Sequence, residues 1–256
     1  MLLSPEEKLD LITKNPKAEK WLRPLLGAEE FINGKDRWCL WLIGIKPNEL
    51  RAMPEVVKRV QGVKEMRLKS RDKGTQELAN FPTQFRESHE YSSYILVPSV
   101  SSERREYVPM GLFDRHTIST NLNLIIPNAT LYEFGILESK MHMAWMRTVV
   151  GRLKSDYRYS AKLVYNNYPW PETDAKQKLA IEKAAQKVLD ARAEEPESTL
   201  ADLYDPLTMP IALRKAHNAL DKCVEKSYRK AVFKDDAERI TFLFERYQAL
   251  VEKKVE

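Results

Sequence analysis

Long hydrophobic runs and clustered cysteines are both absent from this sequence. A membrane-spanning helix needs about 18 consecutive apolar residues, and no run of that length occurs. The N-terminus, MLLSPEEKLDL, has neither the basic start nor the apolar stretch of a signal peptide. Cys39 and Cys223 belong to no CxxC motif or Cys/His cluster, so we expect two buried thiols. These absences favour a cytoplasmic protein without a membrane partner.

Glycine is also scarce, which bears on methyl transfer. The eight glycines include no Gly-x-Gly, the start of a loop that binds the methionine end of S-adenosylmethionine. Amino-methyltransferases also need an Asp/Asn-Pro-Pro-Tyr/Phe motif, which holds a flipped base. The nearest imitation is Asn167-Tyr168-Pro169-Trp170, and only one proline follows its first two residues. We therefore expect no methyl transfer by this chain.

Patterns of metal ligands are weak as well. The four histidines show no metal-ligand spacing; they are His89, His116, His142 and His217. Three triplets match half of a metal-dependent nuclease motif, but no Pro-Asp precedes them; they are Glu6-Glu7-Lys8, Glu138-Ser139-Lys140 and Asp174-Ala175-Lys176. A nuclease remains an alternative, and we expect no metal or cofactor in this chain.

The composition that is present is typical of a folded globular protein, with 43% hydrophobic and 31% charged residues in a chain of 256. Its net charge of +5 is unevenly placed. The first 50 residues carry 8 basic and 8 acidic side chains, residues 51–160 carry 17 and 12, and residues 161–256 carry 17 and 17. A polyanion would therefore meet the middle of the chain.

Apolar spacing predicts an α+β fold, with an irregular, mostly antiparallel sheet and packed helices followed by a C-terminal helical subdomain. Two short helices are expected in the first 25 residues, the first capped by Ser4. Strands are expected near residues 38–45, 94–100, 107–113 and 122–129. Further helices are expected near residues 54–69, 131–150, 172–194, 210–230 and 235–254. The helix expected over residues 131–150 should be buried along an apolar stripe, which consists of Phe134, Leu137, Met141, Trp145 and Val149.

Residues 64–73, KEMRLKSRDK, carry five basic and two acidic side chains. Arg67, Lys69, Arg71 and Lys73 alternate, so an extended backbone would place them on one face. Cations on one face can contact successive phosphates and release counterions. A solvated helix end explains this segment equally well.

Residues 101–107, SSERREY, connect two expected strands and can project from a sheet. Arg can donate two hydrogen bonds to guanine and Glu can accept one from cytosine, so Glu103 and Arg105 are candidates for reading one C·G pair. An extended backbone would point both side chains to the same side. Contacts to the DNA backbone are expected from Ser101, Ser102 and Arg104. A surface ion-pair cluster is the alternative.

Residues 151–160, GRLKSDYRYS, mix cations, tyrosines and serines directly after the expected long helix. Such groups can hold a phosphate backbone and position a loop in a groove. The candidates for backbone contacts are Arg152, Lys154, Ser155, Tyr157, Arg158 and Tyr159. The alternative is a purely structural link between a helix and a strand.

Seven blocks across nearly the whole chain resemble, in order, the C-terminal part of MmeI-like, type IIL restriction-modification enzymes. The blocks are GAEEFING (27–34), LRAMP (50–54), SSERREYVPMG (101–111), MHMAWMR (141–147), GRLKSDYRYS (151–160), YNNYPWP (165–171) and LADLYDPLTMP (200–210). The resemblance implies a DNA target-recognition domain in residues 36–171, with connector helices in residues 1–35 before it and a helical subdomain in residues 172–256 after it. It supports Glu103 and Arg105 as base-reading residues and adds Arg71 and Tyr107.

The same resemblance implies sequence-specific recognition of double-stranded DNA in a bacterial or archaeal cytoplasm, without catalysis by this chain. The nuclease and the S-adenosylmethionine-dependent adenine methyltransferase of such enzymes have no counterpart here. S-adenosylmethionine and Mg²⁺ are therefore expected only in those missing domains, and the methyltransferase domain is an expected partner. A helical protein-interaction module is the rival interpretation, because one apolar stripe could dock on that domain: Ile240, Phe244, Tyr247 and Val251.

Overall fold

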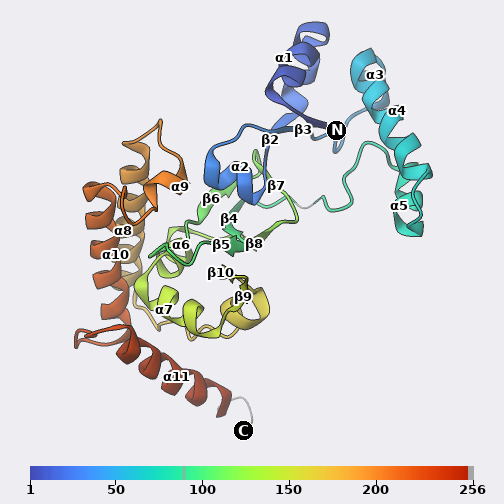
Figure 1. The fold of residues 1–256 in the computed structure, drawn as a ribbon. Coiled ribbons are helices and arrows are strands. Elements are labelled where there is room, and N and C mark those ends of the chain that lie inside the picture. Colours follow the sequence, from blue (N-terminus) through green and yellow to red (C-terminus); the bar gives the residue numbers. More distant parts are fainter. Residues whose placement is uncertain (89, 253–256) are drawn as a thin grey trace. The chain divides into compact units, whose positions relative to one another are not determined.

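The structure, a computed structural model, describes residues 1–88 and 90–252 (Figure 1). The chain forms two compact units, each built from separate stretches of sequence. Unit 1 comprises Met1–Leu26, Lys35–Tyr91 and Arg115–Thr120, and unit 2 comprises Gly27–Gly34, Ser92–Asp114 and Asn121–Glu256. Unit 2 therefore runs across the division that the sequence suggested between residues 171 and 172.

Unit 1 is built on a four-stranded sheet in the order β1-β3-β2-β7, in which β7 runs parallel to β2 and the other pairs are antiparallel. Leu11, Leu40 and Val56 are fully buried in its core. Its elements are β1 (Leu2–Leu3), α1 (Pro5–Lys14), η1 (Pro16–Trp21), β2 (Leu22–Leu26), β3 (Trp38–Leu40), α3 (Pro47–Arg51), α4 (Pro54–Leu68), α5 (Lys73–Glu77), η2 (Leu78–Asn80) and β7 (Ile118–Ser119).

Local sequence explains the helix starts in unit 1. As expected, Ser4 caps α1: its hydroxyl accepts a hydrogen bond from the Glu7 backbone at 3.2 Å, and the Glu7 side chain bonds back to the Ser4 backbone. The second expected helix is a short 3-10 helix, η1. The expected strand over residues 38–45 is shorter, because the chain turns at Gly44 with a φ of 76°.

Unit 2 holds two three-stranded antiparallel sheets, β6-β4-β8 and β5-β10-β9, together with the C-terminal helices (Figure 1). The expected strand over residues 107–113 begins only at Gly111. The elements of unit 2 are α2 (Ala28–Asn33), β4 (Ser93–Pro98), β5 (Val100–Ser101), β6 (Gly111–Asp114), β8 (Asn123–Pro127), α6 (Leu131–Leu137), α7 (Lys140–Val149), β9 (Gly151–Leu153), β10 (Asp156–Arg158), η3 (Ala161–Tyr165), α8 (Ala175–Ala193), α9 (Leu200–Leu203), α10 (Ile211–Tyr228) and α11 (Asp236–Glu252).

One continuous core joins the sheet residues of unit 2 to its C-terminal helices. Four members of the expected stripe are buried there, namely Phe134, Leu137, Met141 and Trp145, whereas Val149 is partly buried. Helices α6 and α8 approach closely at Gly135, where an added Cβ would lie 2.8 Å from the Cγ2 atom of Ile181. Because the helices supply much of this core, they are part of the body that carries the sheets.

The long helix expected over residues 131–150 is broken into α6 and α7. The break falls at Ser139, whose backbone is extended with a φ of −94° and a ψ of 160°, and the side chain of the preceding Glu138 bonds to the Met110 backbone and to Arg192. The first turn of α7 is then capped from a distant helix, as the Lys140 backbone N–H donates to Asp221 Oδ1 at 2.7 Å. The other expected C-terminal helices correspond to α8, α10 and α11, and the expected end of the last one lies outside the described residues.

Candidate nucleic-acid interface

Sheet β5-β10-β9 brings together two segments that the sequence singled out separately. Strand β5 leads into the loop of residues 102–106, called here the reading loop, and β9 and β10 form a hairpin. Tyr157 of β10 is paired with Ser101 of β5, and Leu153 is paired with Asp156 across the hairpin turn. The expected groups of residues 101–107 and 151–160 therefore lie on adjacent strands of one sheet.

The reading loop does not adopt the extended backbone that the sequence suggested. Ser102 to Arg105 form a turn closed by a 3.2 Å hydrogen bond from the Arg105 N–H to the Ser102 carbonyl. Glu103 and Arg104 are the central residues of the turn, and their side chains are exposed. Ser101 is buried, and its hydroxyl has no hydrogen-bond partner among the described residues. The premise that Glu103 and Arg105 share a side through an extended strand is therefore wrong.

Arg105 nevertheless differs from the other charged side chains of the loop. Burial lowers the pKa of the partly buried Arg105, while the nearby Asp156 and Asp205 act to raise it. Within the described part of the chain, the Arg105 side chain makes no hydrogen bond and no ion pair. Glu103 bonds through Oε2 to Nη1 of Arg152 at 3.2 Å. A partly desolvated guanidinium without a partner is suited to bind a ligand.

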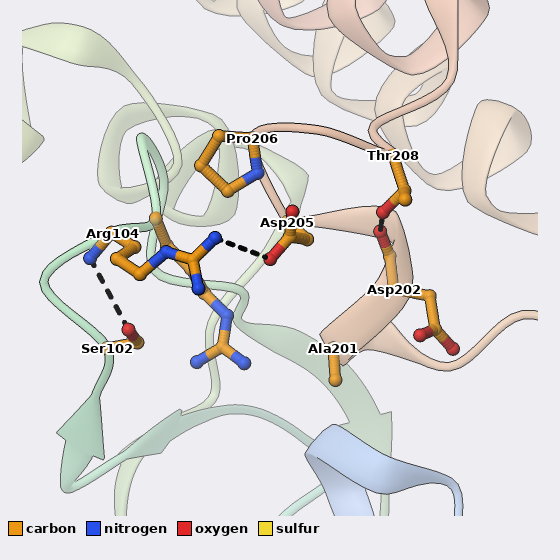
Figure 2. A pocket seen from close by; sticks show the side chains of 8 residues that line it. Ser102, Arg104, Ala201, Asp202, Asp205, Pro206 and Thr208 are labelled. Carbon is orange, nitrogen blue, oxygen red and sulfur yellow. Dashed lines mark hydrogen bonds and ion pairs between the residues drawn. The ribbon is translucent and has the colours of Figure 1, made fainter.

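A pocket lies beside the reading loop and faces the segment around α9 (Figure 2). Arg104 reaches across it to Asp205, with 3.5 Å between the guanidinium and the carboxylate. The pocket is lined by Ser102, Arg104, Arg105, Ala201, Asp202, Asp205, Pro206 and Thr208. The two arginines and the two aspartates give it mixed charge, so it is not a site for a simple anion.

The β9–β10 hairpin presents cations at its surface. Arg152, Lys154, Ser155 and Arg158 are exposed, and all three residues of β9 are exposed. Lys154 stands at the two-residue turn with a φ of 57°, in the left-handed region that non-glycine residues adopt at a cost. Among the described residues, the side chains of Lys154 and Arg158 form no ion pair or hydrogen bond. They are available to a polyanion.

Three tyrosines that the sequence suggested as DNA contacts are buried, which corrects that expectation. Tyr107 is 2% exposed, its hydroxyl donates to Asp221 Oδ2 at 2.7 Å, and its ring stacks on His217 with centroids 4.0 Å apart. Tyr159 shares a 2.9 Å hydrogen bond with His142, and Tyr157 packs under Arg152. Tyr157 and Tyr159 are two positions apart along and just after β10, so both side chains point to the covered side of the sheet.

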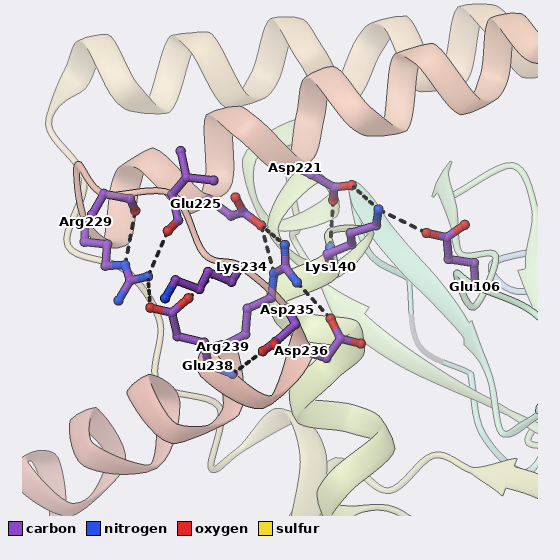
Figure 3. A network of polar contacts seen from close by, with 12 residues as sticks. Glu106, Lys140, Asp221, Glu225, Arg229, Lys234, Asp235, Asp236, Glu238 and Arg239 are labelled. Carbon is purple, nitrogen blue, oxygen red and sulfur yellow. Dashed lines mark hydrogen bonds and ion pairs between the residues drawn. The ribbon is translucent and has the colours of Figure 1, made fainter.

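A polar network missed by the sequence interpretation holds Glu106, the last residue of the reading loop, and Figure 3 shows this residue beside Lys140 and Asp221. Lys140 Nζ lies 3.1 Å from Glu106 and 3.9 Å from Asp221, and Arg214 lies 3.4 Å from Glu106. Arg147 also donates to the Glu106 carbonyl. The only sequence signal was the acidic residue at position 106 within SSERREY, because its partners are distant in sequence.

A second polar group, called here the Arg192 cluster, consists of Glu138, Arg192, Tyr204 and His217. Arg192 donates to Glu138 Oε1 at 2.8 Å and to the Met110 carbonyl at 2.6 Å, and Tyr204 shares a 2.8 Å hydrogen bond with His217. Burial raises the pKa of Glu138 although Arg192 acts to lower it. Burial likewise raises the pKa of the neighbouring Asp221 to about 6. His217 of this cluster and His142, the partner of Tyr159, are fully buried, and burial lowers the pKa of both.

The basic segment of unit 1 is divided between a structural and an exposed part. Arg67 lies in the last turn of α4 and is 8% exposed, and it donates to the carbonyls of Leu78, Phe81 and Gln84 at 2.6 to 3.0 Å. The backbone is not extended here, because it passes from α4 through a turn into α5, so the four cations do not share one face of a strand. The exposed side chains, which have no ion pair among the described residues, are Lys69, Arg71 and Lys73.

The residues considered for metal binding have structural roles. Among residues 1–88 and 90–252, no group of three or more His, Cys, Asp or Glu side chains could hold a metal ion. Glu7 and Asp174 cap helices, and Glu138 is buried against Arg192. Cys39 is buried and Cys223 partly buried. His89 lies outside the described residues.

The apolar stripe of α11 is mostly used within unit 2. Ile240 and Tyr247 pack against the core, and Phe244 lies 5.2 Å from Trp145 between ring centroids. Phe244 and Val251 remain 37% and 41% exposed, which leaves a narrow apolar edge. In the part of the chain that the structure describes, no helix is long and apolar enough to cross a membrane.

Comparisons with known proteins match the whole chain. Residues 1–172 match the family model described as MmeI, target recognition domain, and residues 173–255 match MmeI, C-terminal domain. DNA methyltransferase A of Bacillus subtilis (strain 168) is 46% identical over 254 residues, which are 99% of this chain and 29% of that protein. The type IIL restriction-modification enzyme MmeI, solved in complex with DNA, is 48% identical with a TM-score of 0.89, covering 98% of this chain and 34% of that chain. The chain thus spans about a third of the length of these relatives.

Proposed function

Because the chain belongs to the MmeI family, matching its target recognition domain and its C-terminal domain, we propose that it recognises a specific sequence in double-stranded DNA. The observation that carries this proposal is the partly buried guanidinium of Arg105, which has no partner among the described residues and lies on a loop beside a cationic hairpin. The solved MmeI relative was in complex with DNA, which supports the same ligand class.

Glu103 and Arg105 are the proposed base-reading residues. Arg105 can donate two hydrogen bonds to guanine O6 and N7, and the Oε1 atom of Glu103 can accept one from cytosine N4. The turn at Ser102 to Arg105 places these side chains on a short loop supported by ion pairs of Glu106. The turn and these ion pairs hold Glu103 and Arg105 in place, although the backbone of the loop is not extended. Tyr107 is not proposed for this role, because it is buried and its hydroxyl bonds to Asp221.

Contacts to the DNA backbone are proposed for the exposed polar and cationic side chains. In unit 2 these are Lys154, Ser155 and Arg158 of the hairpin and Arg104 of the reading loop, to which we add the half-buried Ser102. In unit 1 they are Lys69, Arg71 and Lys73, among which Arg71 remains a candidate for base reading. Phosphate contacts give affinity that falls with salt and carries no sequence information.

Catalysis is proposed to lie outside this chain. The relatives extend well beyond the matched region, and one is named a DNA methyltransferase. An adenine-specific, S-adenosylmethionine-dependent methyltransferase domain is therefore the proposed protein partner, and S-adenosylmethionine and Mg²⁺ are assigned to such further regions. The purified chain should transfer no labelled methyl group to DNA and should not nick DNA with Mg²⁺. Either activity, if it follows the protein through purification, would overturn this assignment.

The recognition proposal is tested by selecting bound duplexes from a random pool and then varying the selected site one position at a time. Affinity should fall as salt rises, with a slope of about −0.9 in log K against log salt for each neutralised phosphate. Substitution of Arg105 by Ala should reduce discrimination at one position by roughly 1–3 kcal/mol and leave nonspecific affinity nearly unchanged. A pool without enriched sequence, or a flat salt response, would contradict DNA recognition.

A further inference from the structure

Arg152 is fixed by three contacts within unit 2. Its Nη1 atom donates to Oε2 of Glu103 at 3.2 Å and to the Ser155 carbonyl at 2.7 Å. Its guanidinium carbon also lies 4.1 Å from the ring centroid of Tyr157. The contacts join the hairpin turn, the buried face of β10 and the reading loop. Arg152 therefore differs from the unpaired cations of the same hairpin.

The pair between Arg152 and Glu103 adds little to folding stability. Their side chains are 44% and 48% exposed, and exposed ion pairs are weakened by water and salt. Its effect is geometric, because a planar guanidinium that stacks on a ring and bonds a carbonyl has few remaining orientations. The carboxylate that it holds is fixed with it. The Oε1 atom of Glu103 stays without a hydrogen bond among the described residues.

Arg152 also acts on Glu103 through its positive charge. A carboxylate that approaches a DNA groove is repelled by the phosphates on both sides. A cation bonded to its far oxygen offsets that repulsion and leaves the near oxygen as an acceptor. Without Arg152, the same carboxylate would be free to rotate and would oppose binding of every duplex.

We propose that Arg152 is a positioning residue for base recognition: it orients and neutralises Glu103, so that the hairpin contributes to sequence specificity. This inference rests on the proposed function and deepens it. Arg158, on the neighbouring strand, supplies the matched contrast, since it is exposed and has no ion pair among the described residues. A variant without Arg158 therefore shows how affinity for DNA changes when an ordinary phosphate contact is lost.

The test compares four variants of the 256-residue chain, R152A, R152K, R158A and E103Q, on the selected duplex varied one position at a time. R152A should lose about tenfold in discrimination at the same position where E103Q loses it. R158A should weaken all duplexes by a similar factor and leave discrimination unchanged. R152K should recover nonspecific affinity but not the full discrimination, because an ammonium lacks the rigid fork of donors. Thermal melting confirms that each variant is folded.

The outcomes separate the two proposals. If R152A weakens all duplexes equally, as R158A does, the positioning role is overturned while DNA recognition stands. If R152A changes discrimination at a position that E103Q does not affect, the link through Glu103 is overturned. If the wild-type chain selects no sequence, the proposed function itself fails.

Discussion

The reading loop and the Arg192 cluster belong to the same unit and use the same side-chain chemistry in opposite ways. In the loop, Arg105 is partly buried and has no partner among the described residues. In the cluster, Arg192 is bonded to Glu138, to Tyr204 and to a backbone carbonyl. A charged side chain whose polar atoms are all bonded within the protein supports the fold, whereas one that keeps an unbonded polar atom is available to a ligand. Partners therefore distinguish the two regions better than residue type does.

The most direct test of this contrast is to replace each of the two arginines by Ala. Arg192→Ala should lower the free energy of unfolding by about 3–5 kcal/mol, because Glu138 would remain buried without its opposite charge. Arg105→Ala should change it by less than about 1 kcal/mol. Urea unfolding followed by circular dichroism measures both. Equal losses would show that Arg105 is also a structural residue.

The buried carboxyl of Asp221 predicts a pH dependence of stability. Burial raises its pKa from 3.8 to about 6, so the folded state binds the proton more tightly than the unfolded state. Stability should therefore be greatest below about pH 4 for this group and fall as pH rises toward 6, by roughly 3 kcal/mol. Urea unfolding of the chain between pH 4 and 7 measures the slope.

The matched control for that slope is Asp221→Asn, which cannot ionise. The slope should become shallower in this variant but not vanish, since the raised pKa of Glu138 acts in the same direction. An unchanged slope would show that Asp221 does not titrate in this range.

The substitution Tyr107→Phe tests whether this residue next to the reading loop stabilises the fold or contacts DNA bases. The variant should lose about 1.5–3 kcal/mol of stability, because the Asp221 carboxylate would lose a buried hydrogen bond. Base preference of the folded protein should stay the same. A change in preference at one position, measured on the varied duplexes, would restore Tyr107 as a reader and would contradict the contrast between the two regions.

The smallest expected effect concerns the hairpin turn. Lys154→Gly removes the unfavourable positive φ and should leave stability unchanged or raise it by less than about 1 kcal/mol. Lys154→Ala keeps the strained backbone and should not stabilise. Both variants should bind all duplexes more weakly, because each lacks the cation. Stability by thermal melting and affinity by gel shift separate strain from charge, and a stabilised Ala variant would refute the strain argument.

Much of the fold followed from the sequence, and the failures have a common cause. The cap at Ser4, the helix opened by Pro54 and the buried residues of α6 and α7 were predicted, because capping and apolar spacing act over a few residues. The break between α6 and α7 was not predicted. It lies where Glu138 and the Lys140 backbone bond to Arg192 and Asp221, which come from distant helices.

The candidate site also combines features that the sequence predicted with features that only the folded chain shows. The sequence indicated where the charges gather, and two of its three segments meet on sheet β5-β10-β9. It misjudged Arg67 and Tyr107, because a basic or aromatic side chain looks the same in sequence whether it is exposed or buried. It also gave no sign that Glu106 is held by Lys140 and Arg214.

The sequence by itself determined the local helices, the basic middle segment and the lack of methyltransferase and metal motifs, since each depends on residue types within a short window. Tertiary structure decided which charges are free. Tyr107 and Asp221, for example, are 114 positions apart and meet only in the folded core. Burial and partnering arise from such long-range contacts, and they assign Arg192 to the core and leave Arg105 available to a ligand.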